Sequence, residues 1–337
     1  MRYRGVCYDV GRVMLGQNWR PDFLVDEVHK ELEIIREDLH CNAVRVCGQD
    51  VERWTRAAEE ALRLGLTVWL APELWDRSPE ETLAYVADAA HRAEALRRQW
   101  PDRVVFSVGS ELTLFMQGIL EGDSVLERLQ HPTFWERIRS GAHREPLQAF
   151  LAEACARVRQ VFHGPVTYAS VPLEPVDWSL FDFVCVDLYR EARIRDRFPD
   201  LLRSFFSHGR PVVITEFGCC TYRGAADAGS RGWAIVDPDK TPPHWLGTFV
   251  RDEAEQAREL GELLAIFEAA GVEGTFVMTF SSPRLPTSTE PRQDLDLASY
   301  SLVKSYTDRT GTAYPGLPWD PKQSFGTVAA HYARSSA

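Results

Sequence analysis

The sequence predicts a (β/α)8 barrel, or TIM barrel, formed as a single domain by residues 1–337. Short apolar runs alternate with longer segments of helical period, which is typical of a parallel sheet built from βα units. Eight such runs can be counted, and eight parallel strands are the number that closes this kind of barrel. The three longest connections all follow the C-terminal ends of strands, and barrel enzymes assemble their active sites on that face.

The eight predicted strands are short and rich in apolar residues, and most include β-branched ones. In chain order they cover residues 3–9, 42–48, 66–73, 103–111, 164–170, 181–189, 211–218 and 273–280. The long connections after strands four, seven and eight cover residues 112–145, 219–251 and 281–318. We therefore expect these three loops to surround the functional site.

Helical segments separate most of the strands. They are expected at residues 22–39, 51–64, 79–99, 145–162, 194–207 and 252–270, with a closing helix at 324–332. The third has a clear start, because Ser78 can cap it, Pro79 suits the first helical position and Glu81 can complete a capping box. The connection from Val171 to Leu180 is short and rich in proline, so its helix is expected to be a single turn.

Composition narrows the classes of partner. Hydrophobic residues make up 45% and charged residues 26%, which suits a globular protein with a sizeable core. The formal net charge of -11 would repel nucleic acid and anionic membrane surfaces. No segment approaches the length of an apolar membrane span, so a cytoplasmic protein is expected. The nine histidines show no metal-binding spacing, and neither metal nor cofactor is predicted.

Cysteine usage indicates buried thiols. The chain has seven cysteines, an odd number, and Cys7, Cys47 and Cys185 lie within predicted strands. Cys219 and Cys220 are adjacent and lack the CxxC spacing of a redox or zinc site. Structural disulfides are therefore not expected.

Two acidic residues stand at strand ends. Glu111 follows the run VVFSVGS and Glu216 follows VVIT, so both side chains are expected to point into the bowl at the top of the barrel. A glycosidase needs two such carboxyls, one protonated to assist the leaving oxygen and one ionised to attack the sugar or stabilise its charge. Glu111 and Glu216 are the predicted catalytic pair.

These residues resemble clan A of the glycoside hydrolases, a superfamily of retaining barrel enzymes. Glu111 in GSE matches the clan's acid/base after strand four, and Glu216 in ITEFG matches its nucleophile after strand seven. Arg45 in NAVRVCG resembles the strand-two arginine that steadies the nucleophile, and Tyr189 in VDLY resembles the strand-six tyrosine that bonds to it. The resemblance covers nearly the whole chain in order, and implies a covalent glycosyl-enzyme mechanism without a cofactor.

Two positions depart from the clan's pattern. Ser110 replaces the asparagine that binds the sugar 2-hydroxyl, and the strand-eight tryptophan under the sugar is represented by Phe280. A sugar of unusual shape or an altered subsite is consistent with both changes. Arg45 and a phenol should lower the pKa of Glu216, whereas apolar surroundings and the nearby charge of Glu216 should raise the pKa of Glu111.

Further residues at the same face are candidates for substrate binding. Asp9, Glu73 and Asp187 could accept hydrogen bonds from sugar hydroxyls or pair with loop arginines. Trp75 and Trp233 lie in or next to top-face loops, where an aromatic ring can stack on a sugar or simply pack the loop. The predicted ligand is a small carbohydrate.

Two other functions remain open. Glu73, Glu111, Asp187 and Glu216 could ring a divalent cation in a metal-dependent isomerase or hydrolase, although Arg45 would repel a cation there. A barrel that binds carbohydrate or protein through its long loops without turnover would also accommodate Ser110 and Phe280.

Overall fold

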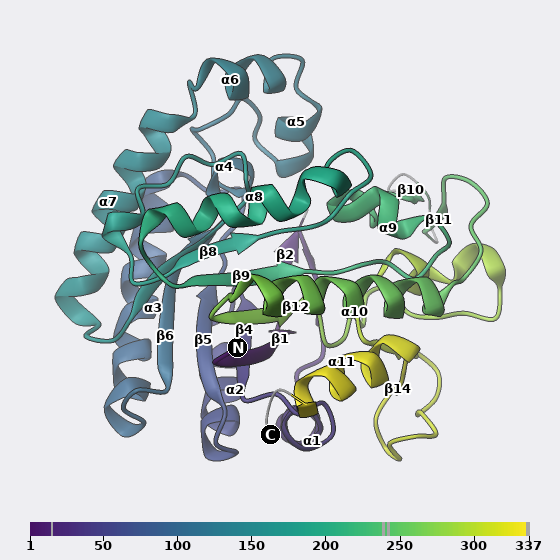
Figure 1. Cartoon of the computed structure of the whole chain (residues 1–337). Coiled ribbons are helices and arrows are strands. Elements are labelled where there is room, and N and C mark those ends of the chain that lie inside the picture. The colour runs from purple at the N-terminus through teal and green to yellow at the C-terminus, as the bar shows by residue number, and fades with distance from the viewer. Residues whose placement is uncertain (15, 238–239, 241–242, 335–337) are drawn as a thin grey trace.

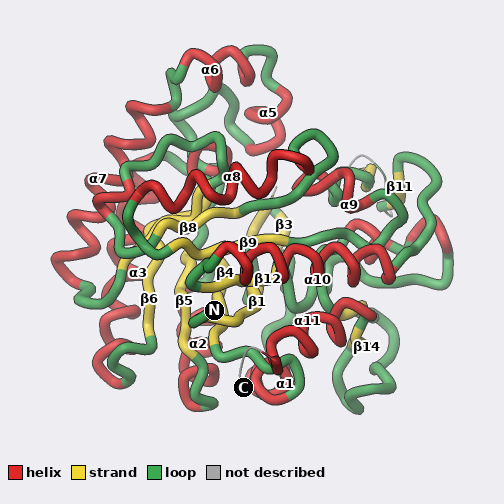
Figure 2. Tube along the Cα trace, viewed as in Figure 1, coloured by secondary structure: helices red, strands yellow, loops and turns green. Residues whose placement is uncertain are grey.

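The fold is a closed barrel of eight parallel strands surrounded by helices, as the sequence predicts. The computed structural model describes residues 1–14, 16–237, 240 and 243–334. Going round the barrel, neighbouring strands pair in the order β1, β12, β9, β8, β7, β6, β5 and β4 (Figures 1 and 2). Their bounds are β1 Tyr3–Asp9, β4 Ala43–Gly48, β5 Thr67–Pro72, β6 Val104–Ser110, β7 Val166–Ser170, β8 Val184–Asp187, β9 Val212–Phe217 and β12 Gly274–Val277.

Helices follow the strands and pack outside the barrel (Figure 2). The main ones are α1 Val25–Glu37, α2 Val51–Arg63, α3 Pro79–Gln99, α7 Arg144–Val161, α8 Phe198–Phe205, α10 Glu253–Ala270 and α11 Gln323–Arg334. The predicted capping box at Ser78 and Glu81 is present at the start of α3. The crossover after β7 holds one turn of 3-10 helix, Trp178–Leu180, as expected from its length.

The long loops carry the smaller elements. They are β2 Val13–Met14, β3 Gln17–Asn18, α4 Leu112–Phe115, α5 Val125–Gln130, α6 Phe134–Ser140, α9 Ala225–Ala228, β10 Val236–Asp237, β11 His244–Trp245, β13 Val303–Ser305 and β14 Trp319–Pro321. The helices α5 and α6 project at the top of Figure 1, and α9, β10 and β11 lie together on its right. The loops after β9 and β12 share a buried cluster that includes Cys220 and Tyr300.

Two layers of apolar residues hold the fold together. Residues such as Val6 and Val44 point outward and pack against the helices. Residues such as Tyr3, Trp69 and Phe276 point inward and fill the barrel, and their rings meet edge to face or tilted, with centroids about 5 Å apart. This alternation is the two-residue period of a strand. The inner apolar residues plug the barrel below, which leaves its other end to polar groups.

The seven cysteines are all buried free thiols in this structure. Within the described part of the chain, none of the helices has the length and apolar character needed to cross a membrane.

Candidate active site

Glu216 lies at the end of β9 and is held by three side chains. Its Oε1 accepts hydrogen bonds from Arg45 Nη1 at 2.6 Å and Arg12 Nη2 at 2.8 Å. Its Oε2 accepts a longer bond from the Tyr189 hydroxyl at 3.4 Å. Burial alone would raise the pKa of Glu216, but the two guanidinium groups outweigh it and lower the pKa below its ordinary value. Glu216 is therefore a carboxylate at neutral pH.

Arg12 is a site residue that the sequence reasoning missed. It follows β1 in a tight turn in which Asp9 Oδ1 accepts the backbone N–H groups of Gly11 and Arg12, at 2.7 and 2.9 Å. Gly11 has a φ of +128°, which favours glycine. The Arg12 guanidinium bridges Glu216 and Glu73, meeting Glu73 at 2.7 and 3.0 Å. The sequence did carry a signal for Arg12, because it is an arginine that follows a predicted strand end at Asp9 by three residues and comes directly after Gly11.

Arg45 reaches inward from β4 and also binds Ser110. Its Nη2 donates to the Ser110 hydroxyl at 2.6 Å while Nη1 holds Glu216. Both residues are almost fully buried. In this geometry the Ser110 oxygen orients the arginine, which in turn orients Glu216.

Glu111 stands at a sharp turn after β6. Its backbone is left-handed, with φ 48° and ψ 41°, and its N–H donates to the carbonyl of Ala169. The next two N–H groups, of Leu112 and Thr113, are bound by the Tyr168 hydroxyl at 2.7 Å and Glu174 Oε1 at 2.8 Å. This turn aims the Glu111 carboxyl at β8 and β9.

The two predicted catalytic carboxyls meet, and Asp187 joins them. One oxygen each of Glu111, Asp187 and Glu216 lies within 4.8 Å of the others. Burial, Asp187, Glu216 and Glu174 raise the pKa of Glu111 well above its ordinary value. Glu111 therefore keeps its proton at a pH at which Glu216 has lost its own. Both pKa shifts have the direction expected from the sequence.

The pKa of Asp187 is raised, like that of Glu111, but groups that favour its ionised form limit the increase. Burial and Glu216 raise its pKa to about 7, although Arg45 and Thr215 counteract the increase. Thr215 donates to Asp187 Oδ1 at 2.6 Å. The strand pairing is irregular between Val186 and Asp187, and the consecutive residues Thr215 and Glu216 both contact residues inside the barrel.

Two predicted aromatic residues lie near these carboxyls. Tyr189 contacts Glu216 and packs its ring against Tyr300, with centroids 5.5 Å apart. Trp75 stacks on Phe115 at 4.2 Å, and the guanidinium carbon of Arg12 lies 6.0 Å from the Trp75 ring. Both side chains are partly exposed, so they remain candidates for contact with a sugar.

The expectation that Phe280 floors the site is wrong. Its ring is fully buried in the outer core, between Tyr8 and Trp319. A strand was expected to reach residue 280, but β12 ends at Val277. Met278 is the strand-eight side chain at the site, where its sulfur lies 3.5 Å from Arg12 Nη1.

Trp233 packs against the buried cluster that contains Cys220 and Tyr300, as Tyr189 and Met278 also do. The stacking of Trp233 on a substrate remains a prediction.

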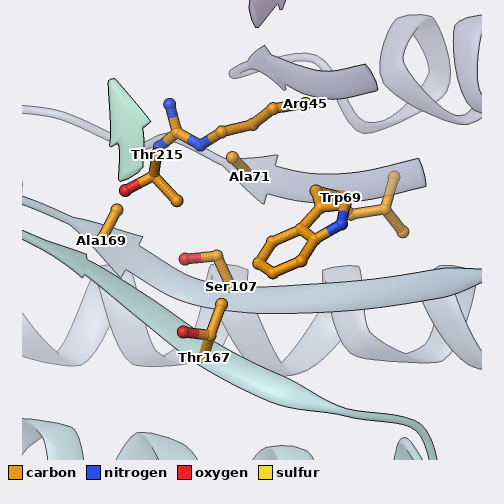
Figure 3. Close-up of a pocket in the computed structure, with 8 residues that line it drawn as sticks. Arg45, Trp69, Ala71, Ser107, Thr167, Ala169 and Thr215 are labelled. Carbon is orange, nitrogen blue, oxygen red and sulfur yellow. The ribbon is translucent and has the colours of Figure 1, made fainter. Parts of the chain in front are cut away.

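A small pocket lies below the carboxyls. Figure 3 shows the Arg45 guanidinium beside Thr215 at one side of this pocket and Trp69 at another, with small side chains around it. The lining residues are Arg45, Trp69, Leu70, Ala71, Ser107, Thr167, Ala169 and Thr215. Because Arg45 binds Glu216 and Thr215 binds Asp187, the pocket adjoins the site from within the barrel.

The donor set fits a divalent cation poorly. Glu111, Asp187 and Glu216 are close enough to share one. However, two guanidinium groups already hold Glu216 Oε1, and a protonated Glu111 would be a poor ligand. The arrangement instead resembles a neutral acid facing an ionised carboxylate.

Comparisons with known proteins agree with the fold. No family model matches the chain, and no curated protein sequence matches it. A solved structure titled as a complex of a GH113 β-1,4-mannanase is similar, with a TM-score of 0.62, 14% identity and 99% of each chain covered. β-Glycosidase BGL167 gives a TM-score of 0.53 at 14% identity, covering 99% of this chain and 96% of its own.

A third similar structure is much longer. It is the FMN-binding β-glucuronidase from Facaelibacterium prausnitzii L2-6, with a TM-score of 0.57 and 14% identity over 99% of this chain, which spans 44% of that protein's length. These neighbours are glycoside hydrolases, which is consistent with the resemblance to clan A. At such identity the likeness shows the shared barrel.

Proposed function

We propose that this protein is a retaining glycoside hydrolase, or a transglycosidase using the same covalent step, that acts on a small β-linked glycoside or oligosaccharide. The observation that carries the proposal is the Glu111–Glu216 pair, in which one oxygen of each carboxyl lies within 4.8 Å of the other. The pKa of Glu111 is raised and that of Glu216 is lowered. Two carboxyls in these states are what the double-displacement reaction requires.

The separation supports retention. Retaining glycosidases place their carboxyl groups about 5 to 5.5 Å apart, whereas inverting enzymes leave about 6.5 to 9.5 Å for a water molecule. One oxygen of Glu111 lies within 4.8 Å of one oxygen of Glu216, a close approach that favours the shorter of these separations. Direct attack by a carboxylate is therefore the better fit.

In the first step, Glu216 would attack the anomeric carbon while Glu111 gives its proton to the departing oxygen. Oε1 of Glu216 is engaged by both Arg12 and Arg45, so Oε2, which accepts the longer bond from Tyr189, is the oxygen placed to form the ester. The glycosidic C–O bond breaks as the ester bond forms. Charge-assisted bonds to Oε1 also hold the carboxylate in a fixed orientation.

In the second step, the ionised Glu111 would take a proton from a water molecule while the oxygen of that water attacks the anomeric carbon. The ester bond then breaks and Glu216 leaves as a carboxylate. A sugar hydroxyl in place of water would give transglycosylation. The two guanidinium groups favour this release, because they stabilise the carboxylate that re-forms.

The proposed substrate class rests on the neighbours. The similar structures are titled as a β-1,4-mannanase, β-glucuronidases and a β-glycosidase. We take from them only the β-linkage, and the partly exposed Trp75 and Tyr189 are the aromatic groups that could bind the sugar.

A screen of 4-nitrophenyl β-glycosides, followed by proton NMR of the first-formed anomer, tests the proposal. We expect a product of retained configuration, insensitivity to EDTA, and a loss of at least about 1000-fold in Glu216→Gln. Azide should rescue Glu216→Gly by forming a glycosyl azide. An inverted product would refute the covalent step.

A carbohydrate-binding barrel without turnover is the second candidate. It is favoured by the engagement of Ser110 with Arg45, since a side chain expected to contact the sugar is occupied within the protein. Sugar binding by calorimetry, together with no hydrolysis of any glycoside in the panel, would support this candidate over the enzyme.

A further inference from the structure

We propose that Asp187 is a positioning residue for Glu111, and that its carboxylate accepts a hydrogen bond from the protonated Glu111 and so keeps the proton on the acid. This inference rests on the proposed function for its role in catalysis. The shared proton itself is a property of the protein that can be measured without a substrate.

The placement of Asp187 supports this assignment. Asp187 is 2% exposed, and Thr215 fixes its Oδ1 through a bond of 2.6 Å. Among the residues that the structure describes, no N–H or hydroxyl group donates to Oδ2. An unsatisfied buried carboxylate oxygen is costly, so a donor is required there.

Glu111 can supply that donor. One carboxyl oxygen of Glu111 lies within 4.8 Å of one carboxyl oxygen of Asp187, and each group shifts the pKa of the other. Two carboxylates have only acceptors, so they can form this bond only when one of them carries a proton. The bond would satisfy Oδ2 and restrict the rotation of the Glu111 carboxyl.

The surrounding charges decide which carboxyl holds the proton. Glu111 faces Asp187 from β8, Glu216 from β9 and Glu174 from the loop after β7, all of which favour its neutral form. Asp187 faces Glu216 as well, but also Arg45 from β4 and the Thr215 hydroxyl, which favour its ionised form. The proton therefore belongs on Glu111, the carboxyl that must protonate the leaving oxygen.

The arrangement also serves the second step. Once Glu111 has given its proton to the leaving group, two ionised carboxylates face each other in a buried site. Their repulsion makes Glu111 a stronger base, which draws a proton from the attacking water. Asp187 would thus act in both steps without contacting the reacting atoms.

The first test is the pH dependence of kcat/KM in Asp187→Asn. The amide removes the charge and can donate to the Glu111 carboxylate, so the basic limb should move to lower pH by about one unit or more. Thr215→Val, which frees Asp187 Oδ1 but keeps the charge, should move it less. The rate with a 2,4-dinitrophenyl glycoside should fall less than with a 4-nitrophenyl glycoside, because the better leaving group needs little proton transfer.

Glu73→Gln is the matched control. It removes one buried charge of the same kind, but Glu73 binds Arg12 rather than Glu111. Glu73→Gln should shift the acid limb of the kcat/KM profile, because that limb follows the ionisation of Glu216. An unmoved basic limb in Asp187→Asn, with equal losses for both leaving groups, would show instead that Asp187 binds the sugar and would overturn the proposal.

The second test needs no turnover. Carboxyl carbon NMR of protein labelled with ¹³C-glutamate, with Glu111 assigned from Glu111→Gln, should show Glu111 titrating at lower pH in Asp187→Asn than in the unmodified protein. Identical titrations would overturn the proposal whether or not a glycosidase activity is found. A shift without any glycosidase activity would contradict the proposed function alone.

Discussion

Replacing Arg12 with methionine is expected to destabilise the protein by about 3 kcal/mol near neutral pH, because breaking a buried ion pair leaves its partners uncompensated. The Arg12 side chain is 8% exposed, and its partners Glu73 and Glu216 are 2% and 11% exposed. Glu216 retains Arg45 at 2.6 Å in the variant. Glu73 keeps only a distant contact with Arg45 at 4.0 Å, so most of the cost should come from Glu73.

This loss translates into a measurable shift in melting temperature. Unfolding entropy is about 2.1 cal/mol/K per residue, or about 0.7 kcal/mol/K for 337 residues. A loss of about 3 kcal/mol therefore lowers Tm by about 4 °C. Calorimetry or circular dichroism resolves a change of that size.

The deficit should depend on pH. Burial already raises the pKa of Glu73, and Arg12 is the largest influence that lowers it, so removing Arg12 raises the folded-state pKa further. A carboxyl whose folded pKa exceeds its unfolded value of about 4.3 loses stability as pH rises through that interval. The Tm deficit should therefore be smaller at about pH 5 than at about pH 8.

A double-mutant cycle isolates the pair. Glu73→Gln alone leaves Arg12 bound to Glu216, and the double variant Arg12→Met with Glu73→Gln has no unpaired carboxylate at position 73. We expect the double variant to be more stable at about pH 8 than the sum of the single losses, by about 1 kcal/mol or more. Additive losses, or a deficit in Arg12→Met that is equal at both pH values, would refute the reasoning.

Further outcomes follow from other contacts. Glu111→Gly should be more stable than Glu111→Ala by about 1 kcal/mol in thermal melts, because the left-handed backbone at φ 48° penalises alanine; equal melts would contradict this. Lys322→Met should lower Tm by less than the about 4 °C of Arg12→Met, because it breaks the buried 2.9 Å pair with Asp296 while Asp296 keeps Arg251 at 2.8 Å; an unchanged Tm would show that the pair is energetically neutral. The seven buried thiols should react with Ellman's reagent only after denaturation, and rapid labelling of the native protein would contradict their burial. If the unmodified protein has the proposed activity, the lowered pKa of Glu216 should place the acid limb of kcat/KM below pH 4.5 and the raised pKa of Glu111 should place the basic limb above it, and a single sigmoid limb would argue against the paired carboxyls.

Local patterns were sufficient for the barrel and for the two glutamates. The apolar runs and helical periods, with signals such as the Ser78 capping box, predicted each strand and main helix to within a few residues. The ends of parallel strands in a barrel share one face, so Glu111 and Glu216 could be expected to meet. Arg45 and Tyr189 were expected from the resemblance to clan A, and both contact Glu216.

Positions that depart from regular strand alternation escaped this reasoning. Strict alternation would direct only one of Thr215 and Glu216 inward, yet irregular pairing lets Thr215 bind Asp187 and Glu216 bind Arg45. The prediction that Phe280 lies at the site was wrong because the regular strand β12 ends before residue 280.

The sequence by itself determined the barrel and the face on which its acidic residues gather, because both depend on periodicities that neighbouring residues carry. Only the tertiary structure decided that Arg12 holds Glu216 and that Asp187 faces Glu111. Those pairings depend on loop turns and strand registers that join distant parts of the chain. The charges of the site arise from such long-range contacts, because burial and the neighbouring groups together set each pKa.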